Sequence, residues 1–334
     1  MNDIILKFKS LKIKVVLKNI YTFFKYDIKQ ESRNSQLLLS NLQVELFEIK
    51  NELLYFKILD YHHNHPSQNY IQEISYLIEI GKVDVFPYKR LKTIKNVEYG
   101  FDNEKQMPYV IHKENRKLYF PKTWGITQAK ETYLSFIEVE SILGGDYLQK
   151  APHQYQTDDF CVKNGDVVLD IGSAEALFSL EIIDIAKKVY IFESDEKWIE
   201  PLKATFEPYQ DKVIIINKLV SNVDSVNSVT LESCIELDEI QSLFVKMDIE
   251  GYEKLVLEGN LAFFSKNIDL RVACCTYHRH DDADDLKKIF DNLAYKTEYS
   301  NGYMLFSYDS DLKAPYFRKG IIRAEKIKKL NNAS

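Results

Sequence analysis

The sequence predicts an α/β protein whose main part is a doubly wound, mostly parallel sheet with an antiparallel final strand. Strand-like and helix-like segments alternate from residue 166 to about residue 307. The strand-like segments are almost continuously apolar, which is typical of parallel strands covered by helices on both faces. Glycine and proline are scarce, with 11 and 8 residues among 334, so disordered and fibrous classes are disfavoured.

The main domain is expected to span residues 151–310. Its parallel strands are predicted at 166–172, 188–194, 212–220, 242–249 and 269–277. Helices are predicted between them, at 177–188, 196–207, 252–264 and 281–293. Residues 295–301 and 303–308 are expected to form an antiparallel hairpin that closes the sheet.

Residues 1–70 are predicted to form two helices. The first, over residues 3–28, is amphipathic and has a lysine-rich face. The second follows a polar break and has apolar residues at heptad spacing. This seam either packs against the first helix or the next domain, or mediates homo-oligomer formation through residues 35–60. Its members are Leu39, Leu42, Leu46, Ile49, Leu53 and Phe56.

Residues 71–150 are interpreted as a small α+β cap that leads into the main domain. Helices are expected near 69–81 and 127–143, and strands at 82–88, 107–112 and 117–122. A loop with His153 and Tyr155 then enters the main domain. The histidines at 62, 63 and 65 are not expected to bind metal, because Pro66 ends their helix and no carboxylate or cysteine is spaced to join them.

Charge is distributed unevenly along the chain. The net charge is −6, but residues 1–30 carry +5, residues 313–334 carry +6 and the segment between them carries −17. The basic ends, including an expected tail at 311–334, are either solvated or attracted to an anionic membrane surface. We expect no nucleic-acid partner, because the acidic body would repel phosphates.

The predicted location is the cytoplasm, with peripheral contact at the inner membrane face as one interpretation of the basic ends. No apolar run approaches the roughly 20 residues of a membrane-spanning helix, and the N-terminus lacks the pattern of a signal peptide. The cysteines have neither disulfide density nor metal-ligand spacing, as expected in a reducing compartment. They are Cys161, Cys234, Cys274 and Cys275.

The stretch VVLDIGSAEALFSL, residues 167–180, joins a strand to a helix through a single glycine, Gly172. Dinucleotide sites use three glycines at a pyrophosphate, so a nicotinamide oxidoreductase is disfavoured. No G-K-[ST] sequence follows, which excludes a Walker-type phosphate site. A carboxylate at Asp170, two residues before the glycine, suits a sulfonium or α-amino group; Ser173 belongs to the same turn.

The ends of the second and third strands supply further candidate cofactor contacts. Glu193 follows Asp170 by 23 residues, where an acid is placed to accept both hydroxyls of a ribose. Ser221 and Asn222, after the third strand, are candidates for adenine contacts.

The fourth and fifth strands supply the candidate catalytic residues. In SLFVKMDIEGYE, alternation places Lys246, Asp248 and Glu250 on one side of the strand. Such charges are costly in a buried strand, so they are expected to open into the cleft at its carboxyl end. His278, at the end of the fifth strand, is a candidate general base.

Two alternatives for these residues stay open. One is a purely structural ion-pair cluster. The other is a Mg²⁺ ion held by Asp248 together with Asp281 or Asp282. We expect no metal, because the aspartates are not at a fixed ligand spacing.

These motifs resemble the FkbM family of S-adenosylmethionine-dependent methyltransferases. VVLDIGSAEALFSL, VYIFESDEKW, SVTLESCIEL and VKMDIEGYEKLVLEG carry the resemblance, which covers about residues 160–310. The run Lys246-x-Asp248-x-Glu250-Gly251-x-Glu253 matches the most distinctive motif of that family. This chain departs from the family pattern at Ala176, where the pattern has glycine, and at Ala174, where it often has asparagine. Alanine at position 176 is unstrained if its φ is negative.

The resemblance implies a class I methyltransferase-like fold, S-adenosylmethionine as cofactor, and O-methylation of a hydroxyl, often in a glycan or glycolipid precursor. His278 or Asp248 would act as base, with Lys246 and Glu250 orienting. The cofactor contacts would come from Asp170, Gly172, Ser173, Glu193, Ser221, Asn222 and Asp248. The alternative is a non-catalytic scaffold of the same fold that self-associates through its N-terminal helices.

Overall fold

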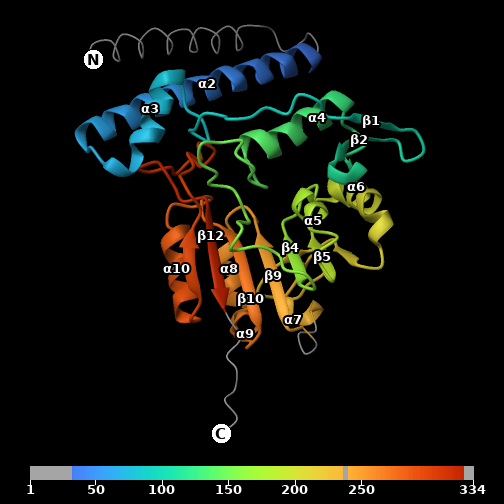
Figure 1. Ribbon diagram of the computed structural model, residues 1–334. Helices are drawn as coiled ribbons and strands as arrows, with labels where there is room; N and C mark the ends of the chain where they lie inside the picture. Colours follow the sequence, from blue (N-terminus) through green and yellow to red (C-terminus); the bar gives the residue numbers. More distant parts are fainter. Residues whose placement is uncertain (1–31, 236–239, 327–334) are drawn as a thin grey trace. The chain divides into compact units, whose positions relative to one another are not determined.

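The computed structural model describes residues 32–235 and 240–326 (Figure 1). These form two compact units. One contains the described residues up to Pro87 and the short segment Ala314–Tyr316, and the other contains Tyr88–Lys313 and the described residues from Phe317 onward. The division predicted at residues 70, 150 and 310 stays a prediction.

The first unit is helical. It contains α2 (Ser32–Asn64), the 3₁₀ turn η1 (Gln68–Tyr70) and α3 (Ile71–Ile80), which ends at Gly81 in the left-handed conformation. His62 in α2 lies 3.0 Å, Nε2 to oxygen, from the carbonyl of Pro315. In the predicted heptad seam Leu39 and Leu46 are exposed and the other members are half-buried. Self-association through this seam stays a prediction, and the helix predicted at 3–28 lies outside the described residues.

The second unit is built on a seven-stranded sheet, and it confirms the predicted fold class. The strand order is β11-β12-β10-β9-β4-β5-β6. All neighbours are parallel except β12, which is antiparallel to both β10 and β11. The strands are β4 (Val167–Ile171), β5 (Lys188–Phe192), β6 (Val213–Ile216), β9 (Ser242–Met247), β10 (Asp269–Cys275), β11 (Lys296–Tyr299) and β12 (Ile321–Lys326).

The strand order reverses between β4 and β9. From β4 the chain continues to β5 and β6 on one side, whereas β9 and β10 lie on the other side. In open α/β sheets such a reversal opens a crevice at the carboxyl ends of the strands, which is where ligands bind. The sequence motifs quoted above lie at these strand ends.

Two strand predictions are wrong. Residues 303–308 do not pair with β11, and Met304 forms only an isolated bridge with Arg318. The partner of β11 is β12, from residues 321–326, which the sequence analysis placed in a basic tail. The charged side chain of Arg323 in β12 is buried, and its guanidinium group donates hydrogen bonds to the carbonyls of Gln154 (2.7 Å) and Tyr155 (3.2 Å). The expected strand at 82–88 is also not formed.

Several predicted elements are interrupted. The third strand ends at Ile216 and continues as β7 (Leu219–Val220), which pairs with β8 (Ser228–Val229). The helix expected at 252–264 is divided at Asn260, whose side chain accepts a hydrogen bond from the Leu231 amide at 2.7 Å.

The helices of the sheet region are α5 (Leu177–Glu181), α6 (Glu196–Phe206), the turn η4 (Glu207–Tyr209), α7 (Leu231–Cys234), α8 (Glu253–Gly259), α9 (Leu261–Ser265) and α10 (Asp282–Asn292).

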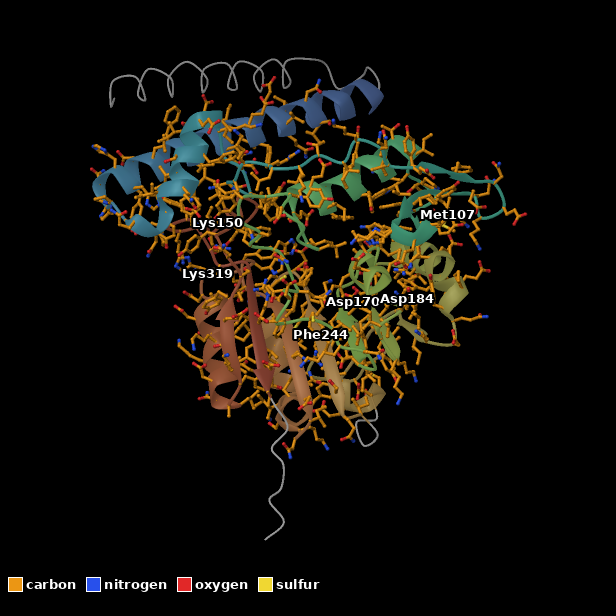
Figure 2. All side chains as sticks on the ribbon, viewed as in Figure 1. Met107, Lys150, Asp170, Asp184, Phe244 and Lys319 are labelled. Atoms are coloured by element: carbon orange, nitrogen blue, oxygen red, sulfur yellow. The ribbon has the colours of Figure 1, made fainter. Side chains whose placement is uncertain are left out.

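The two faces of the sheet bury different residues of the same strands. Leu243, Val245 and Met247 of β9 pack with side chains of α7, α8, α9 and α10. Phe244 faces the opposite side, where its ring stacks on Phe178 of α5 at 5.8 Å between centroids. Because side chains alternate along a strand, Asp170 of β4 and Lys246 of β9 also face α5, and Ser179 of α5 donates a hydrogen bond to Asp170. Figure 2 labels Asp170 and Phe244.

A small antiparallel sheet precedes the main one. It comprises β1 (Tyr99–Asp102), β2 (Met107–His112) and β3 (Arg116–Tyr119), with the turn η2 (Lys113–Asn115) between β2 and β3. The Tyr119 amide donates to Thr205 Oγ1 of α6 at 3.0 Å, which fastens this sheet to the main domain. The helix predicted at 127–143 is α4 (Ile126–Leu134) followed by a π-helical turn, η3 (Ser135–Val139).

Within the described residues, no helix combines the length and the apolar character that crossing a membrane requires.

A buried ion pair joins the starts of three neighbouring strands. Arg271 of β10 is 1% exposed, and its Nη2 lies 2.9 Å from each carboxylate oxygen of Asp166, just before β4. The same nitrogen donates to Ser242 Oγ of β9 at 2.7 Å, and Nη1 donates to the Cys161 carbonyl. One guanidinium group therefore ties together the beginnings of β4, β9 and β10.

Replacing Arg271 with methionine should lower the free energy of unfolding by about 3–5 kcal/mol, because it leaves the Asp166 carboxylate buried without a counter-charge. Urea unfolding of the full chain measures the change. The matched control is Lys287→Met, which removes the exposed pair with Asp291 in α10 and should change stability by less than about 1 kcal/mol. Equal effects of the two substitutions would contradict the role given to Arg271.

Candidate functional site

The turn after β4 requires a glycine at position 172. Gly172 has a φ of 75°, and a Cβ placed on it would lie 1.9 Å from the carbonyl oxygen of Asp248. Its amide donates to the Phe192 carbonyl at 2.9 Å, while the Asp248 amide donates to the Ile171 carbonyl at 3.0 Å. The backbones of β4, β5 and β9 are therefore held together where the strand order reverses.

Both departures from the FkbM pattern lie in left-handed backbone. Ala174 has a φ of 46° and Ala176 a φ of 59°. The condition of a negative φ at position 176 is thus not met. A left-handed alanine costs roughly 1 kcal/mol relative to glycine, and asparagine tolerates this conformation better than alanine does. The turn consequently holds two strained residues beside the end of β4.

Replacing Ala174 with glycine should raise the free energy of unfolding by about 0.5–1 kcal/mol, because it relieves this strain at a half-buried position. Ala176→Gly should be nearly neutral, since it also removes a buried methyl group worth about 0.8 kcal/mol. Urea unfolding compares both with Ala262→Gly, at an exposed helical position in α9, which should lose about 1 kcal/mol. A destabilising Ala174→Gly would mean that the turn is not strained.

Asp170 and Lys246 pair with each other beneath this turn. They are neighbours in the β4–β9 register, and Lys246 Nζ lies 3.0 Å from Asp170 Oδ1. Lys246 also donates to the Gly172 carbonyl at 2.5 Å, and Ser179 Oγ donates to Asp170 Oδ2 at 2.7 Å. Burial alone would lower the pKa of Lys246, but the carboxylates of Asp170 and Asp248 raise it, so the lysine is charged. The structure brings these two predicted site residues together, but neither is among the residues that line the cavity described next.

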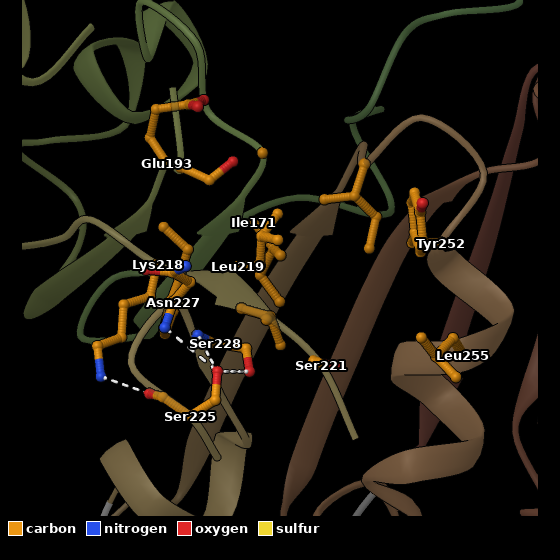
Figure 3. A pocket seen from close by; sticks show the side chains of 15 residues that line it. Ile171, Glu193, Lys218, Leu219, Ser221, Ser225, Asn227, Ser228, Tyr252 and Leu255 are labelled. Carbon is orange, nitrogen blue, oxygen red and sulfur yellow. Dashed lines mark hydrogen bonds between the residues drawn. The ribbon is translucent and has the colours of Figure 1, made fainter. Parts of the chain in front are cut away.

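A cavity of about 370 Å³ opens at the carboxyl ends of β4, β5 and β9. Three predicted cofactor contacts line it, namely Gly172, Glu193 and Ser221. Figure 3 shows Glu193 on one side of the cavity and side chains at the start of α8 on the other. The walls are apolar or aromatic at Ile171, Leu219, Ile249, Tyr252 and Leu255, and polar at Ser225, Asn227 and Ser228.

Glu193 is held in place by backbone amides. Its Oε2 accepts a hydrogen bond from the Ala174 amide at 2.8 Å and its Oε1 accepts one from the Asp195 amide at 2.7 Å. Each carboxylate oxygen accepts two hydrogen bonds, so the side chain retains capacity for one further donor at each oxygen. It is therefore oriented by the protein and still able to receive two hydroxyl groups.

The other predicted cofactor contacts lie outside the cavity. Ser173 is buried, and its Oγ has no hydrogen-bond partner among the described residues. Asn222 is exposed and accepts a hydrogen bond from Ser221 Oγ at 3.2 Å. Neither residue belongs to the lining of the cavity.

Asp248 is the centre of a cluster of acids, histidines and tyrosines. It does not line the cavity itself, but its carbonyl oxygen lies against Gly172, and its chain neighbour Ile249 lines the cavity. Asp248 Oδ2 accepts a hydrogen bond from the Tyr155 hydroxyl at 2.7 Å and lies 3.4 Å from Nε2 of His153. Its Oδ1 lies 3.4 Å from the Tyr277 hydroxyl and 3.5 Å from Nε2 of His278. Although burial favours the protonated form, hydrogen bonding by His153 and the charges of His278, His153 and Lys246 hold the pKa of Asp248 well below its usual range.

His278 lies between three carboxylates. Its Nδ1 is 3.0 Å from Oε1 of Glu253, and its Nε2 is 3.5 Å from both Asp248 Oδ1 and Glu250 Oε2. Burial lowers the pKa of His278, but Glu253 and Asp248 outweigh it and raise the pKa. The charged form is therefore favoured, which makes the imidazole alone a weaker candidate for the base. Glu250 has an 84% exposed side chain and lies on the solvent side.

The predicted catalytic residues are thus partly brought together. Asp248 and Glu250 each lie 3.5 Å from Nε2 of His278. Lys246 instead pairs with Asp170. Sequence reasoning missed His153, whose Nδ1 lies 3.2 Å from Glu140. Burial lowers the pKa of His153, but Asp248 and Glu140 raise it to about 9, so it is protonated at neutral pH. The sequence analysis noted the loop with His153, but nothing in the spacing of its residues predicts that this loop contacts Asp248, just after β9.

Two groups of potential metal ligands are present among the described residues. Asp248, Glu253 and His278 form one, and His153, Asp248 and Cys275 form the other; in each, the ligand atoms lie within 4.8 Å of one another. Asp281 and Asp282, the partners considered in the sequence, belong to neither group. Asp282 instead accepts a hydrogen bond from the Arg279 amide at 2.8 Å.

Glu175, in the turn after β4, is buried close to the Asp248 cluster. Its side chain is removed from water, and the charge of Glu140 opposes its ionisation while Lys246 and backbone amides favour it. Burial dominates and raises the pKa of Glu175 to about 8. The carboxyl is therefore mostly neutral in the folded protein at neutral pH.

Because the pKa of Glu175 is raised on folding, its contribution to stability is present below the ordinary glutamate pKa and is lost as pH rises through about 8. Relative to Glu175→Gln, the wild type should lose unfolding free energy between pH 5 and pH 9, on the order of a few kcal/mol. Urea unfolding across this pH range measures the difference. Glu196→Gln, at the exposed start of α6, is the control and should follow the wild type. Parallel profiles of Glu175→Gln and wild type would refute the assignment.

No protein-family model and no curated protein matches the chain. Solved structures do match about half of it. A precorrin-6y C5,15-methyltransferase from Geobacter metallireducens GS-15 is 13% identical, with a TM-score of 0.32, over 49% of this chain and 82% of that one. An rRNA methylase from Streptococcus thermophilus is 11% identical, with a TM-score of 0.33, over 50% and 89%.

A third match is Sp1610 of Streptococcus pneumoniae, solved in complex with S-adenosyl-L-methionine. It is 17% identical, with a TM-score of 0.34, over 52% of this chain and 71% of that one. Because the identities and TM-scores are low, neither the ligands nor the substrates of these proteins are transferred to this chain.

Proposed function

We propose that this protein is an S-adenosylmethionine-dependent methyltransferase of the FkbM family that methylates a hydroxyl group. The observation that carries the proposal is the cavity at the reversal of strand order, bounded by Gly172 and Glu193 and adjoining the Asp248 cluster. Ile249 and Tyr252 line the cavity and lie in sequence between the acids Asp248 and Glu253. A methyl donor in the cavity would therefore have these acids close to it.

The residues of the cavity fit the proposed cofactor. Its volume of about 370 Å³ falls in the range of small-molecule sites. Glu193 has capacity for two hydroxyl donors, as a ribose requires. The apolar walls at Ile171, Leu219 and Leu255 suit a flat base, with Ser221 offering a polar contact at the edge. When bound, the cofactor supplies an electrophilic methyl group on a positively charged sulfur.

The Asp248 cluster would prepare the acceptor. Asp248 is held ionised and oriented by Tyr155 and His153, so it would accept a hydrogen bond from the acceptor hydroxyl. The Asp248 carboxylate would receive the hydroxyl proton as the acceptor oxygen takes the methyl group and the positively charged sulfur becomes neutral. Glu250, which is exposed beside His278, would hand the proton to water. The main contribution of the protein is alignment of the two reactants.

A glycan or glycolipid precursor is the proposed acceptor class. Aromatic rings lie next to the acids, since the ring of Phe306 is 5.5 Å from that of His278 and 5.7 Å from that of Tyr308. Tyr308 is 67% exposed. An apolar ring face beside carboxylates suits a sugar, which presents both C–H groups and hydroxyls.

The wild-type protein should bind S-adenosylmethionine and S-adenosylhomocysteine with micromolar affinity, and should not bind NADH. Isothermal titration calorimetry measures all three. Glu193→Gln should weaken binding by about tenfold or more, since it removes the charged acceptor for the ribose hydroxyls. Glu196→Gln, outside the cavity, is the control and should bind as the wild type does. No binding of either sulfur compound would favour the alternative of a non-catalytic scaffold.

A further inference from the structure

The side chains of Asp248, Glu253 and His278 have nearly the spacing of the ligands of one metal ion. Ligand atoms of Asp248, Glu253 and His278, one from each residue, lie within 4.8 Å of one another. Two atoms that each lie about 2.1 Å from one cation are separated by roughly 3.0–4.2 Å, depending on the angle between them. Small shifts of the side chains, together with loss of the imidazole proton, would therefore bring one oxygen of each acid and one nitrogen of His278 onto one ion.

The hydrogen bonding of these side chains is incomplete. His278 is 6% exposed; its Nδ1 lies 3.0 Å from Glu253 Oε1 and its Nε2 lies 3.5 Å from Asp248 Oδ1, but neither contact has the geometry of a hydrogen bond within the described part of the chain. Glu253 is fully buried; its Oε1 accepts a hydrogen bond from the Ile249 amide at 3.0 Å, but Oε2 has no hydrogen-bond partner there. Buried polar atoms are seldom left in this state, and a bound ion would complete their contacts.

The donor set indicates the kind of cation. Carboxylate oxygens suit Mg²⁺, Ca²⁺ and Mn²⁺, whereas imidazole suits transition metals. Two carboxylates with one imidazole nitrogen therefore favour a divalent transition-metal ion such as Mn²⁺. The side chain of Asp248 is 18% exposed and Glu250 lies beside it on the solvent side, which gives an ion a path to the site.

We propose that Asp248, Glu253 and His278 form a binding site for one divalent transition-metal cation next to the cofactor cavity. Binding of the cation is independent of methyl transfer. Its role rests on the proposed function: the cation would take the acceptor hydroxyl oxygen as a ligand and promote loss of its proton. The proton would leave through Glu250 to water, and the new carbon–oxygen bond would form as the bond from the methyl carbon to sulfur breaks.

The test is titration of the full-length, chelator-treated protein with MnCl₂, followed by the electron paramagnetic resonance signal of free Mn²⁺. One equivalent should bind, and Mn²⁺ should raise the melting temperature, because it binds the folded state. Glu253→Gln and His278→Gln should each weaken binding by about tenfold or more. Far-UV circular dichroism without metal establishes that each variant is folded, and Asp248→Asn replaces any variant that is not.

Two control variants separate this site from its surroundings. Cys275→Ser alters the other group of potential ligands, and Asp281→Asn removes an exposed acid nearby; both should bind Mn²⁺ as the wild type does. Absence of Mn²⁺ binding, or binding that Glu253→Gln and His278→Gln leave unchanged, would overturn the proposal. Loss in Cys275→Ser alone would overturn it in favour of the other group.

Calorimetry with S-adenosylmethionine, run in parallel, separates this proposal from the proposed function. Mn²⁺ binding without S-adenosylmethionine binding would leave the metal site standing and reject the methyltransferase. Binding of S-adenosylmethionine with no Mn²⁺ bound would reject the metal site and leave the methyltransferase standing.

Discussion

The architecture of the site depends on the buried ion pair between Asp170 and Lys246. These residues join β4 to β9 at the point where the strand order reverses, and Lys246 also donates to the carbonyl of Gly172. The pair therefore fixes both the strand register and the turn that borders the cavity. An ion pair this deeply buried is expensive to desolvate, and Ser179 provides the additional hydrogen bond that such a pair needs.

The sequence predicts the parallel strands well but not the face to which each charged side chain turns. The apolar runs at 167–171 and 242–247 are strands as expected, because continuous hydrophobicity is a strong signal of burial. Alternation along β4, however, turns Asp170 towards α5, whereas Ile171 lines the cavity. The sequence of a single strand shows that the two residues face opposite sides of the sheet, and only the packed helices show which of them faces the cavity.

Other parts of the site come from contacts that have no local signal. His153 reaches Asp248 from the loop before β4, and Arg323 reaches the same loop from β12. Glu253 belongs to the run that resembles the FkbM motif, but its full burial beside His278 depends on α8 and the end of β10 meeting in three dimensions. The positive φ angles of Ala174 and Ala176 in the turn after β4 likewise have no local signal, since alanine does not favour them.

The position of β12 has a consequence for the order of folding. This strand, residues 321–326, lies between β10 and β11 and supplies the antiparallel partner of both. During synthesis on the ribosome, β10 emerges about 45 residues before β12 does, so its outer edge stays unpaired for that interval. An open, apolar strand edge invites pairing with another chain. Completion of the sheet, and with it protection from aggregation, therefore waits for a segment far downstream of the motifs around Asp170 and Asp248.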